Sequence, residues 1–91
     1  MLVAVAYDVV DDSRRTRLHE RLKDFGTPVQ YSVFECLLEE GDLVRMQEAI
    51  AALIDCNVDR VRLYLLCGSC ADRVRIIGQG KLTRDEHAYV V

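Results

Sequence analysis

The chain has 91 residues, the length of a single domain, and a formal net charge of −3. This charge excludes a uniformly basic nucleic-acid-binding protein, so any site for phosphate groups has to be local. A hydrophobic content of 51% with 30% charged residues excludes a disordered chain, and no stretch approaches the roughly 18 apolar residues of a membrane span.

The first apolar run is not preceded by basic residues and is interrupted by Asp8, which argues against a signal peptide. We therefore expect a cytoplasmic protein without membrane contact. Its cysteines, Cys36, Cys56, Cys67 and Cys70, are then expected as thiols and not as a disulfide framework. The single C-x-x-C motif at residues 67–70 is a weak sign of zinc, and we expect it at a turn, where a facultative disulfide stays open.

Residues 2–9 are almost all apolar and predict a strand that is covered on both faces. Residues 11–13, Asp-Asp-Ser, offer N-cap chemistry to a helix that runs to about Phe25 and stops at Gly26. Leu18, Leu22 and Phe25 form the apolar stripe of this helix.

Residues 29–38 predict either one strand or two short strands that bend near Ser32. A turn at residues 39–41 and a second helix capped by Asp42 follow. Residues 60–66 alternate between apolar and polar side chains, as in a half-buried strand, and residues 73–77 predict one more short strand.

This order predicts an α+β fold of the ferredoxin-like β-α-β-β-α-β type, a sandwich with both helices on one face of a mostly antiparallel sheet. We assign residues 1–80 to this domain and residues 81–91 to a C-terminal tail. The open face and edges of such a sheet favour a homodimer.

Asp8 is the first candidate functional residue, because a carboxylate at the end of a buried strand is costly unless it is capped, paired or metal-bound. Capping or pairing with an arginine stays open beside metal binding. One carboxylate makes a poor Mg²⁺ site, but a two-fold axis near Asp8 would supply a second. A metal held there would activate water and neutralise charge on a phosphodiester.

Arg14 and Arg15 lie in the first turn of the helix, where the helix dipole disfavours cations, and Arg17 follows on the same flank as Arg14. The two aspartates just before them offer one way to offset this cost. A phosphate group held by backbone N–H groups and guanidinium forks is the other, which we favour because Asp8 is close.

Tyr7, Tyr31 and Phe34 are the aromatic residues near this site. Phe34 fits a core position best, whereas Tyr7 or Tyr31 could orient a water or contact a sugar. We expect His19 and His87 at the surface and therefore no histidine-based acid–base catalysis.

Residues 7–12 (Tyr-Asp-Val-Val-Asp-Asp), residues 14–15 (Arg-Arg) and residues 29–36 (Val-Gln-Tyr-Ser-Val-Phe-Glu-Cys) closely resemble the small CRISPR-associated endonuclease family, the Cas-two proteins. The resemblance covers nearly the whole chain, is specific over residues 1–38 and is weak in the tail. It implies a ferredoxin-like homodimer in which Asp8 of each subunit faces the other and holds a divalent metal such as Mg²⁺. It further implies an extra C-terminal strand at residues 88–91 that joins the partner's sheet.

The resemblance implies a metal-dependent endonuclease of RNA or DNA that acts beside the CRISPR integrase in spacer acquisition, an antiviral defence. In one departure from the family, Pro28 stands where many members have a basic residue, so one phosphate contact is expected to be missing. The functional residues that carry over are catalytic and metal-binding Asp8 and substrate-binding Tyr7, Arg14, Arg15, Arg17, Ser32 and Phe34.

Two alternatives to this CRISPR-associated endonuclease stay open. A non-catalytic scaffold would present the same arginines to duplex DNA and bridge integrase dimers. A toxin-type messenger-RNA interferase on the same fold would act without a CRISPR partner.

Overall fold

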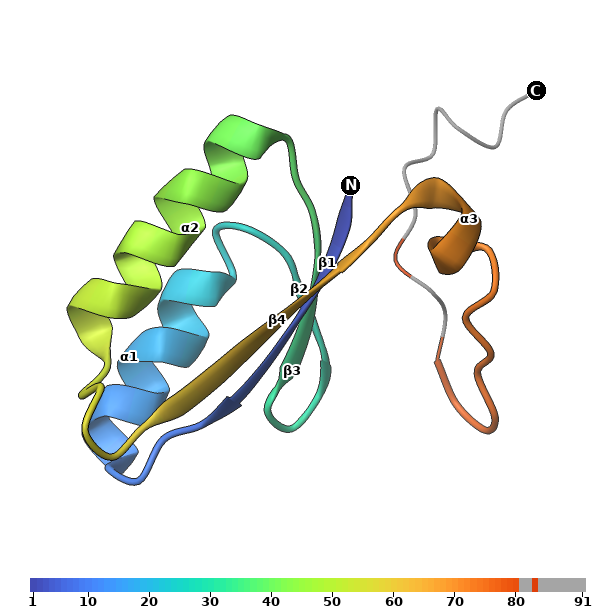
Figure 1. The fold of residues 1–91 in the computed structure, drawn as a ribbon. Coiled ribbons are helices and arrows are strands. Elements are labelled where there is room, and N and C mark those ends of the chain that lie inside the picture. Colours follow the sequence, from blue (N-terminus) through green and yellow to red (C-terminus); the bar gives the residue numbers. More distant parts are fainter. Residues whose placement is uncertain (81–82, 84–91) are drawn as a thin grey trace.

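The computed structural model describes residues 1–80 and Thr83. Four strands form one antiparallel sheet in the order β2-β3-β1-β4, with α1 and α2 packed on the same face (Figure 1). This is the predicted ferredoxin-like arrangement. The elements are β1 (Leu2–Asp8), α1 (Asp12–Leu22), β2 (Thr27–Gln30), β3 (Val33–Leu37), α2 (Glu40–Leu53), β4 (Arg60–Leu66) and α3 (Gly68–Ala71).

The core lies between the sheet and the two long helices, and the alternation along β1 builds one side of it. Val3, Val5 and Tyr7 point into this core and are 0–6% exposed. The first helix contributes the expected stripe through Leu18 and Leu22, and α2 contributes Met46 and Ile50, all fully or almost fully buried. No helix in the described part of the chain is long and apolar enough to cross a membrane.

The other face of the sheet carries the remaining residues of β1 and their cross-strand neighbours. Ala6 pairs with Arg62 and Asp8 pairs with Arg60 of β4, so these side chains share one face. We call it the open face, because α1 and α2 do not cover it. Residues 68–80 stand on this side of the sheet in Figure 1, and the N–H of Thr83 donates to Glu35 Oε1 at 3.0 Å.

One open alternative is decided, and two sequence-based expectations need correction. Residues 29–38 follow the two-strand alternative, in which β2 and β3 meet at a turn through Tyr31 and Ser32. The second helix begins at Glu40 and not after a 39–41 turn, because Asp42 acts from inside the first turn and accepts from the Glu39 N–H at 3.4 Å. Residues 73–77 are not a strand, although their apolar residues suggested one.

The C-x-x-C motif also differs from its expected setting. Cys67 is the N-cap of α3, which follows β4 directly, so the motif begins a short helix and not a plain turn. Both thiols are free and exposed, as is Cys56, whereas Cys36 is buried. The predicted strand at residues 88–91 and His87 lie outside the described residues.

Gly26 permits a close approach between the α1–β2 connection and β3. The helix ends at Leu22, slightly before the expected Phe25, and the N–H of Gly26 still donates to Leu22 O at 3.0 Å. A Cβ on Gly26 would lie 2.5 Å from Cys36 Sγ and would also collide with the Glu35 carbonyl oxygen. A backbone atom cannot move aside as a flexible side chain does, so this position requires glycine for space.

We expect Gly26→Ala to lower the free energy of unfolding by about 1–3 kcal/mol, the usual cost of overpacking a close contact. Urea denaturation followed by circular dichroism measures this change. Gly68→Ala is the matched control, because a Cβ there meets nothing within 4 Å and should leave stability unchanged or slightly higher. Equal stability of the two variants would show that β3 yields freely at Glu35.

Candidate functional site

The carboxyl end of β1 meets the turn between β2 and β3 and the start of α1. The N–H of Tyr7 donates to Ser32 O at 3.1 Å, which fixes the turn against the end of the strand. Three of the residues predicted from the sequence, Tyr7, Asp8 and Ser32, therefore lie at one edge of the sheet. The alternation along β1 sends the Tyr7 side chain toward the helices and the Asp8 side chain to the open face.

Asp8 is exposed at this edge and takes part in no ion pair with any described residue. The cap of α1 is Asp11, which accepts from the Arg14 N–H at 2.9 Å. The two ordinary explanations for a carboxylate at this place, a cap and an arginine pair, therefore do not apply in the described structure.

Two arginines that we did not single out as site residues lie beside Asp8. Arg60 stands directly opposite Asp8 on β4, and Arg62 follows on the same face. A shallow hollow of about 230 Å³ is lined by Ala6, Tyr7, Asp8, Arg60 and Arg62. Arg60 forms no ion pair with any described residue, and a hydrogen bond with Tyr64 raises the pKa of Arg62. The sequence placed these arginines on the outward side of a strand, but only the β1–β4 register shows that they face Asp8.

Asp8 is the one carboxylate that lines its hollow among the described residues, so it is the one ligand of the right kind there for the expected divalent metal. Carboxylate oxygen is the donor that Mg²⁺ prefers, and such sites take one or two carboxylates with waters and substrate phosphate. Among the described residues, no group of three or more histidine, cysteine or carboxylate side chains could hold an ion. The cysteines are likewise not gathered, so the zinc alternative gains no support from residues 1–80.

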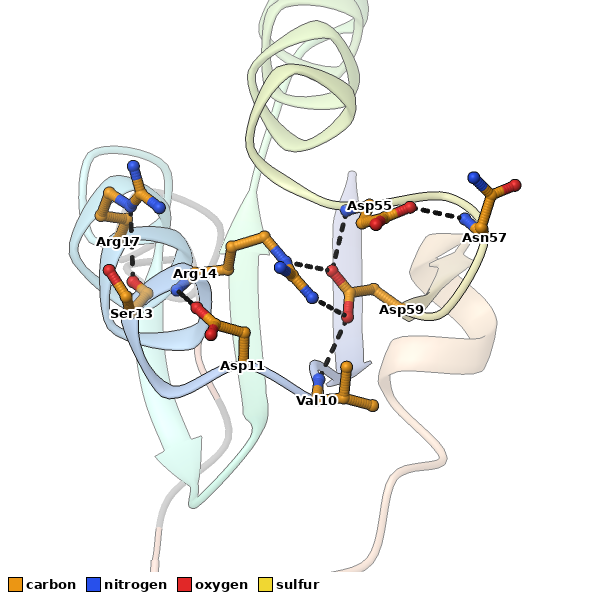
Figure 2. A network of polar contacts seen from close by, with 8 residues as sticks. All are labelled: Val10, Asp11, Ser13, Arg14, Arg17, Asp55, Asn57 and Asp59. Atoms are coloured by element: carbon orange, nitrogen blue, oxygen red, sulfur yellow. Dashed lines mark hydrogen bonds and ion pairs between the residues drawn. The ribbon is translucent and has the colours of Figure 1, made fainter.

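Arg14 is held in an ion pair with the buried Asp59 (Figure 2). Its Nε and Nη2 donate to the two carboxylate oxygens of Asp59 at 2.9 and 3.2 Å. The Asp59 side chain is fully buried, whereas that of Arg14 is 24% exposed. Arg14 therefore has a structural role and does not line the hollow around Asp8, and its phosphate contact stays a prediction.

Asp59 connects three segments of the chain, and no local pattern in the sequence indicated this role. Besides the two bonds from Arg14, its carboxylate accepts from the N–H groups of Val10 at 3.1 Å and Asp55 at 2.8 Å (Figure 2). The hydrogen bond from Arg14 holds the pKa of Asp59 well below its usual range, the two N–H groups add to this effect, and burial opposes it.

The other two predicted arginines stay accessible. Arg15 donates to the exposed carboxylate of Asp12 at 2.5 Å, so one of the aspartates proposed to offset the helix dipole does so. Arg17 is exposed, and its Nε donates only to Ser13 O at 3.4 Å among the contacts of the described residues. Both guanidinium groups remain available to an anion.

A second hollow, of about 300 Å³, lies on the helix side of the same edge. Its lining residues are Tyr7, Arg15, Thr16, His19, Gln30 and Tyr31. Tyr7 Oη lies 3.1 Å from Nδ1 of His19, and burial, followed by the nearby Tyr31, raises the pKa of Tyr7, while Arg15 opposes the rise. His19 is thus half-buried in a hollow and is not the free surface residue that we expected.

Phe34 does not line either of these two hollows. Its ring is 0% exposed and packs against the edge of His19, with ring centres 5.1 Å apart. Phe34 therefore has a packing role, which agrees with its preference for the core, and its substrate contact stays a prediction. The Phe34 ring thereby packs against the ring of His19 from the core side.

The chain is thus a ferredoxin-like α+β sandwich whose central strand ends in an exposed aspartate that has no ion-pair partner among the described residues and has arginines beside it. Residues 1–74 match the family described as CRISPR associated protein Cas2, and the chain belongs to this family. The resemblance stated from the sequence is thereby confirmed.

Among similar proteins, the CRISPR-associated endoribonuclease Cas2 3 of Chloroflexus aurantiacus is 38% identical over 100% of this chain and 98% of its own length. The CRISPR-associated endonuclease Cas2 2 of Thermus thermophilus is 42% identical over 89% of this chain and 86% of its own. The crystal structure of Streptococcus pyogenes Cas2 superimposes with a TM-score of 0.75 at 32% identity, covering 86% of this chain and 100% of that one. The crystal structure of the hypothetical protein TT1823 from Thermus thermophilus superimposes with a TM-score of 0.80 at 42% identity, covering 89% of this chain and 94% of that one.

We expect Asp59→Asn to lower the melting temperature by at least about 4–8 °C, because Arg14 keeps its charge and loses its partner. The pH dependence has a defined sign. A pKa below the ordinary 3.8 means that the Asp59 carboxylate stabilises the fold fully above about pH 5 and loses this effect as acid protonates it. The wild type should therefore lose more stability than the variant between about pH 5 and 2.

Thermal melts over this pH range measure both effects. Glu20→Gln is the control, because its ion pair with Lys23 at 3.1 Å is exposed and should contribute little. If Asp59→Asn melts like the wild type with the same acid profile, the Asp59 carboxylate does not hold the three segments together.

Proposed function

We propose that this chain is an endonuclease that hydrolyses phosphodiester bonds of RNA or DNA, with Asp8 as its metal ligand. The observation that supports this most is the exposed Asp8 carboxylate, which has no ion-pair partner among the described residues and has Arg60 directly across from it. A carboxylate and guanidinium groups around one hollow match the two needs of phosphodiester cleavage, which are a metal ligand and donors to the phosphate oxygens.

The proposed active form is a homodimer built through the open face. One chain supplies one carboxylate, and an isologous two-fold contact near Asp8 would supply the second. Leu37 and Tyr64 on the open face are 39% and 49% exposed, so this face has apolar area to bury. The arrangement would also offset the limited core of a 91-residue chain.

Other residues would bind the phosphates of the substrate and hold the shape of this edge of the sheet. Arg60 and Arg62 lie on the face of Asp8 and would hold the scissile phosphate and its developing charge by forked hydrogen bonds. Arg15 and Arg17 would hold the flanking phosphates. Ser32 and Tyr7 keep the edge in shape through their backbone bond. A bound Mg²⁺ would supply Lewis acidity and a water of lowered pKa.

The cellular role that we propose is spacer acquisition beside the CRISPR integrase, in the cytoplasm. The non-catalytic scaffold remains the second candidate, and one observation favours it. The accessible arginines do not depend on a metal for binding DNA, whereas cleavage depends on a second carboxylate that is not found beside Asp8 in the described part of one chain.

We expect Asp8→Asn to reduce Mg²⁺-dependent cleavage by at least about 100-fold, because even indirect partners of a metal typically contribute 10–100-fold. The assay compares single-stranded RNA and duplex DNA with Mg²⁺ titrated and with EDTA. Asp24→Asn is the matched control, since this exposed carboxylate lies at the far end of α1. Equal cleavage by wild type and Asp8→Asn contradicts the metal role. Absence of cleavage with retained DNA binding would favour the scaffold.

We expect Arg60→Gln to flatten the salt dependence of nucleic-acid binding by about one unit for each phosphate that is no longer neutralised, because every neutralised phosphate releases counterions. Fluorescence anisotropy at several salt concentrations measures the slope of log K against log salt. Arg45→Gln is the control, because Arg45 is paired with Asp42 on α2, away from Asp8. An unchanged slope for Arg60→Gln would remove Arg60 from the phosphate-binding surface.

A further inference from the structure

The hollow on the helix side of the edge, which we call the aromatic hollow, has the size and lining of a small-ligand site. It is defined by Tyr7, Arg15, Thr16, His19, Gln30 and Tyr31. Its volume of about 300 Å³ is at the lower end of the range for ligand sites, so it suits one flat ring and not a larger molecule. Only part of this set has a structural explanation.

Tyr31 has no packing role that explains it. Its side chain is 87% exposed at the tip of the β2–β3 turn, although most aromatic residues in small domains are used in the core. An exposed tyrosine on a rigid turn presents a flat face to solvent. Aromatic faces of this kind stack on unpaired nucleobases with little dependence on sequence.

The polar groups of the hollow suit the edge of a base. Nδ1 of His19 is engaged with Tyr7 Oη at 3.1 Å, so in the neutral ring Nε2 is the donor when Tyr7 donates. Gln30 adds an amide that both donates and accepts. The edge contact with Phe34 limits the movement of the imidazole.

The charge of the hollow suits a phosphate. Arg15 lines it, and the only ion-pair partner of Arg15 among the described residues is Asp12, whose side chain is 94% exposed. An exposed pair of neighbouring helix residues contributes little, so a phosphate can replace Asp12 at small cost. Arg17, two residues further along α1, is exposed but lies about 200° around the helix from Arg15, so it does not add to this hollow.

The aromatic hollow adjoins the end of β1 that carries Asp8, on the opposite side of the sheet. Tyr7 lines both hollows, and its N–H is bonded to the residue that follows Tyr31. A strand that passes around this end of the sheet would meet both Asp8 and Tyr31. In a duplex a base at Tyr31 would be stacked and paired, so withdrawing it would be costly.

We propose that the aromatic hollow binds one unpaired nucleobase of the strand that reaches Asp8, with Tyr31 stacking on the base and Arg15 holding its phosphate. This inference rests on the proposed function and adds to it a subsite for one base. From the sequence, Tyr31 was a candidate only for orienting a water or contacting a sugar, and His19 was expected only as a surface residue.

The chain contains no tryptophan, so Tyr31→Trp places a single fluorescent reporter in the hollow. We expect single-stranded RNA to quench its emission, whereas a strand with an abasic position or a duplex of the same length should not. Tyr31→Ala should weaken single-strand binding by about 5- to 150-fold and leave duplex binding within about twofold, whereas Tyr31→Phe should bind like the wild type.

Val44→Ala is the control for loss of an exposed apolar side chain, since Val44 is 52% exposed on α2. Unchanged single-strand affinity of Tyr31→Ala together with unquenched Tyr31→Trp overturns the base site. An equal loss for single strand and duplex also overturns it, because Tyr31 would then only support the turn. If Tyr31→Ala still cleaves in an Asp8-dependent way with unchanged KM, the proposed nuclease stands and the base site is overturned. If Tyr31→Trp is quenched by single-stranded RNA but no cleavage is seen, the base site stands and the proposed nuclease is overturned.

Discussion

The buried carboxylate of Asp59 is the constraint on which the site depends. It binds Arg14 of α1, the N–H of Val10 two residues after Asp8 and the N–H of Asp55 at the end of α2. Asp59 is also the residue just before Arg60, which stands across from Asp8. One buried carboxylate thus holds the backbone close to Asp8 and the backbone next to its cross-strand neighbour Arg60. A buried ion pair adds little net stability compared with apolar packing, but it permits only one arrangement of its donors. Four donors on two oxygens therefore define geometry more than they add stability.

The alternation of a single strand then divides the chemistry between two faces. Tyr7 enters the space beneath the helices, and Asp8 emerges on the open face one residue later. The proposed metal ligand and the proposed base site are in this way neighbours along the backbone but lie on opposite sides of the sheet. This arrangement suits a small domain, because the strand at the centre of its core also carries the proposed functional side chains at its end.

The sequence predicted what is local and missed what depends on register. The structure confirms the elements that have a local signal in the sequence. These are the strand within the apolar run of residues 2–9, the stripe of Leu18 and Leu22, and the alternating strand at residues 60–66. The pairing of Asp8 with Arg60 and the burial of Asp59 arise only when distant segments meet, and no spacing in the chain encodes them. Local signals also misled at residues 73–77, where apolar residues suggested a strand that has no neighbour in the described sheet. The family resemblance gave Arg14 and Phe34 as substrate contacts, and the fold shows that both also have contacts within the protein.

The distribution of charge partners is compatible with the proposed phosphate binding at one place on an acidic chain. On the helices, several arginines have a carboxylate three residues away, as in Arg15 with Asp12, Arg21 with Asp24 and Arg45 with Asp42. These pairs cancel positive charge over most of the helical surface. Arg60 and Arg62 on β4 have no ion-pair partner among the described residues, and they lie beside the equally unpaired Asp8. The net charge of −3 disfavours binding of nucleic acid to the surface as a whole, so the proposed attraction depends on local groups such as these. Such a distribution favours recognition of a strand that can be placed against Asp8 over general attachment to duplex DNA.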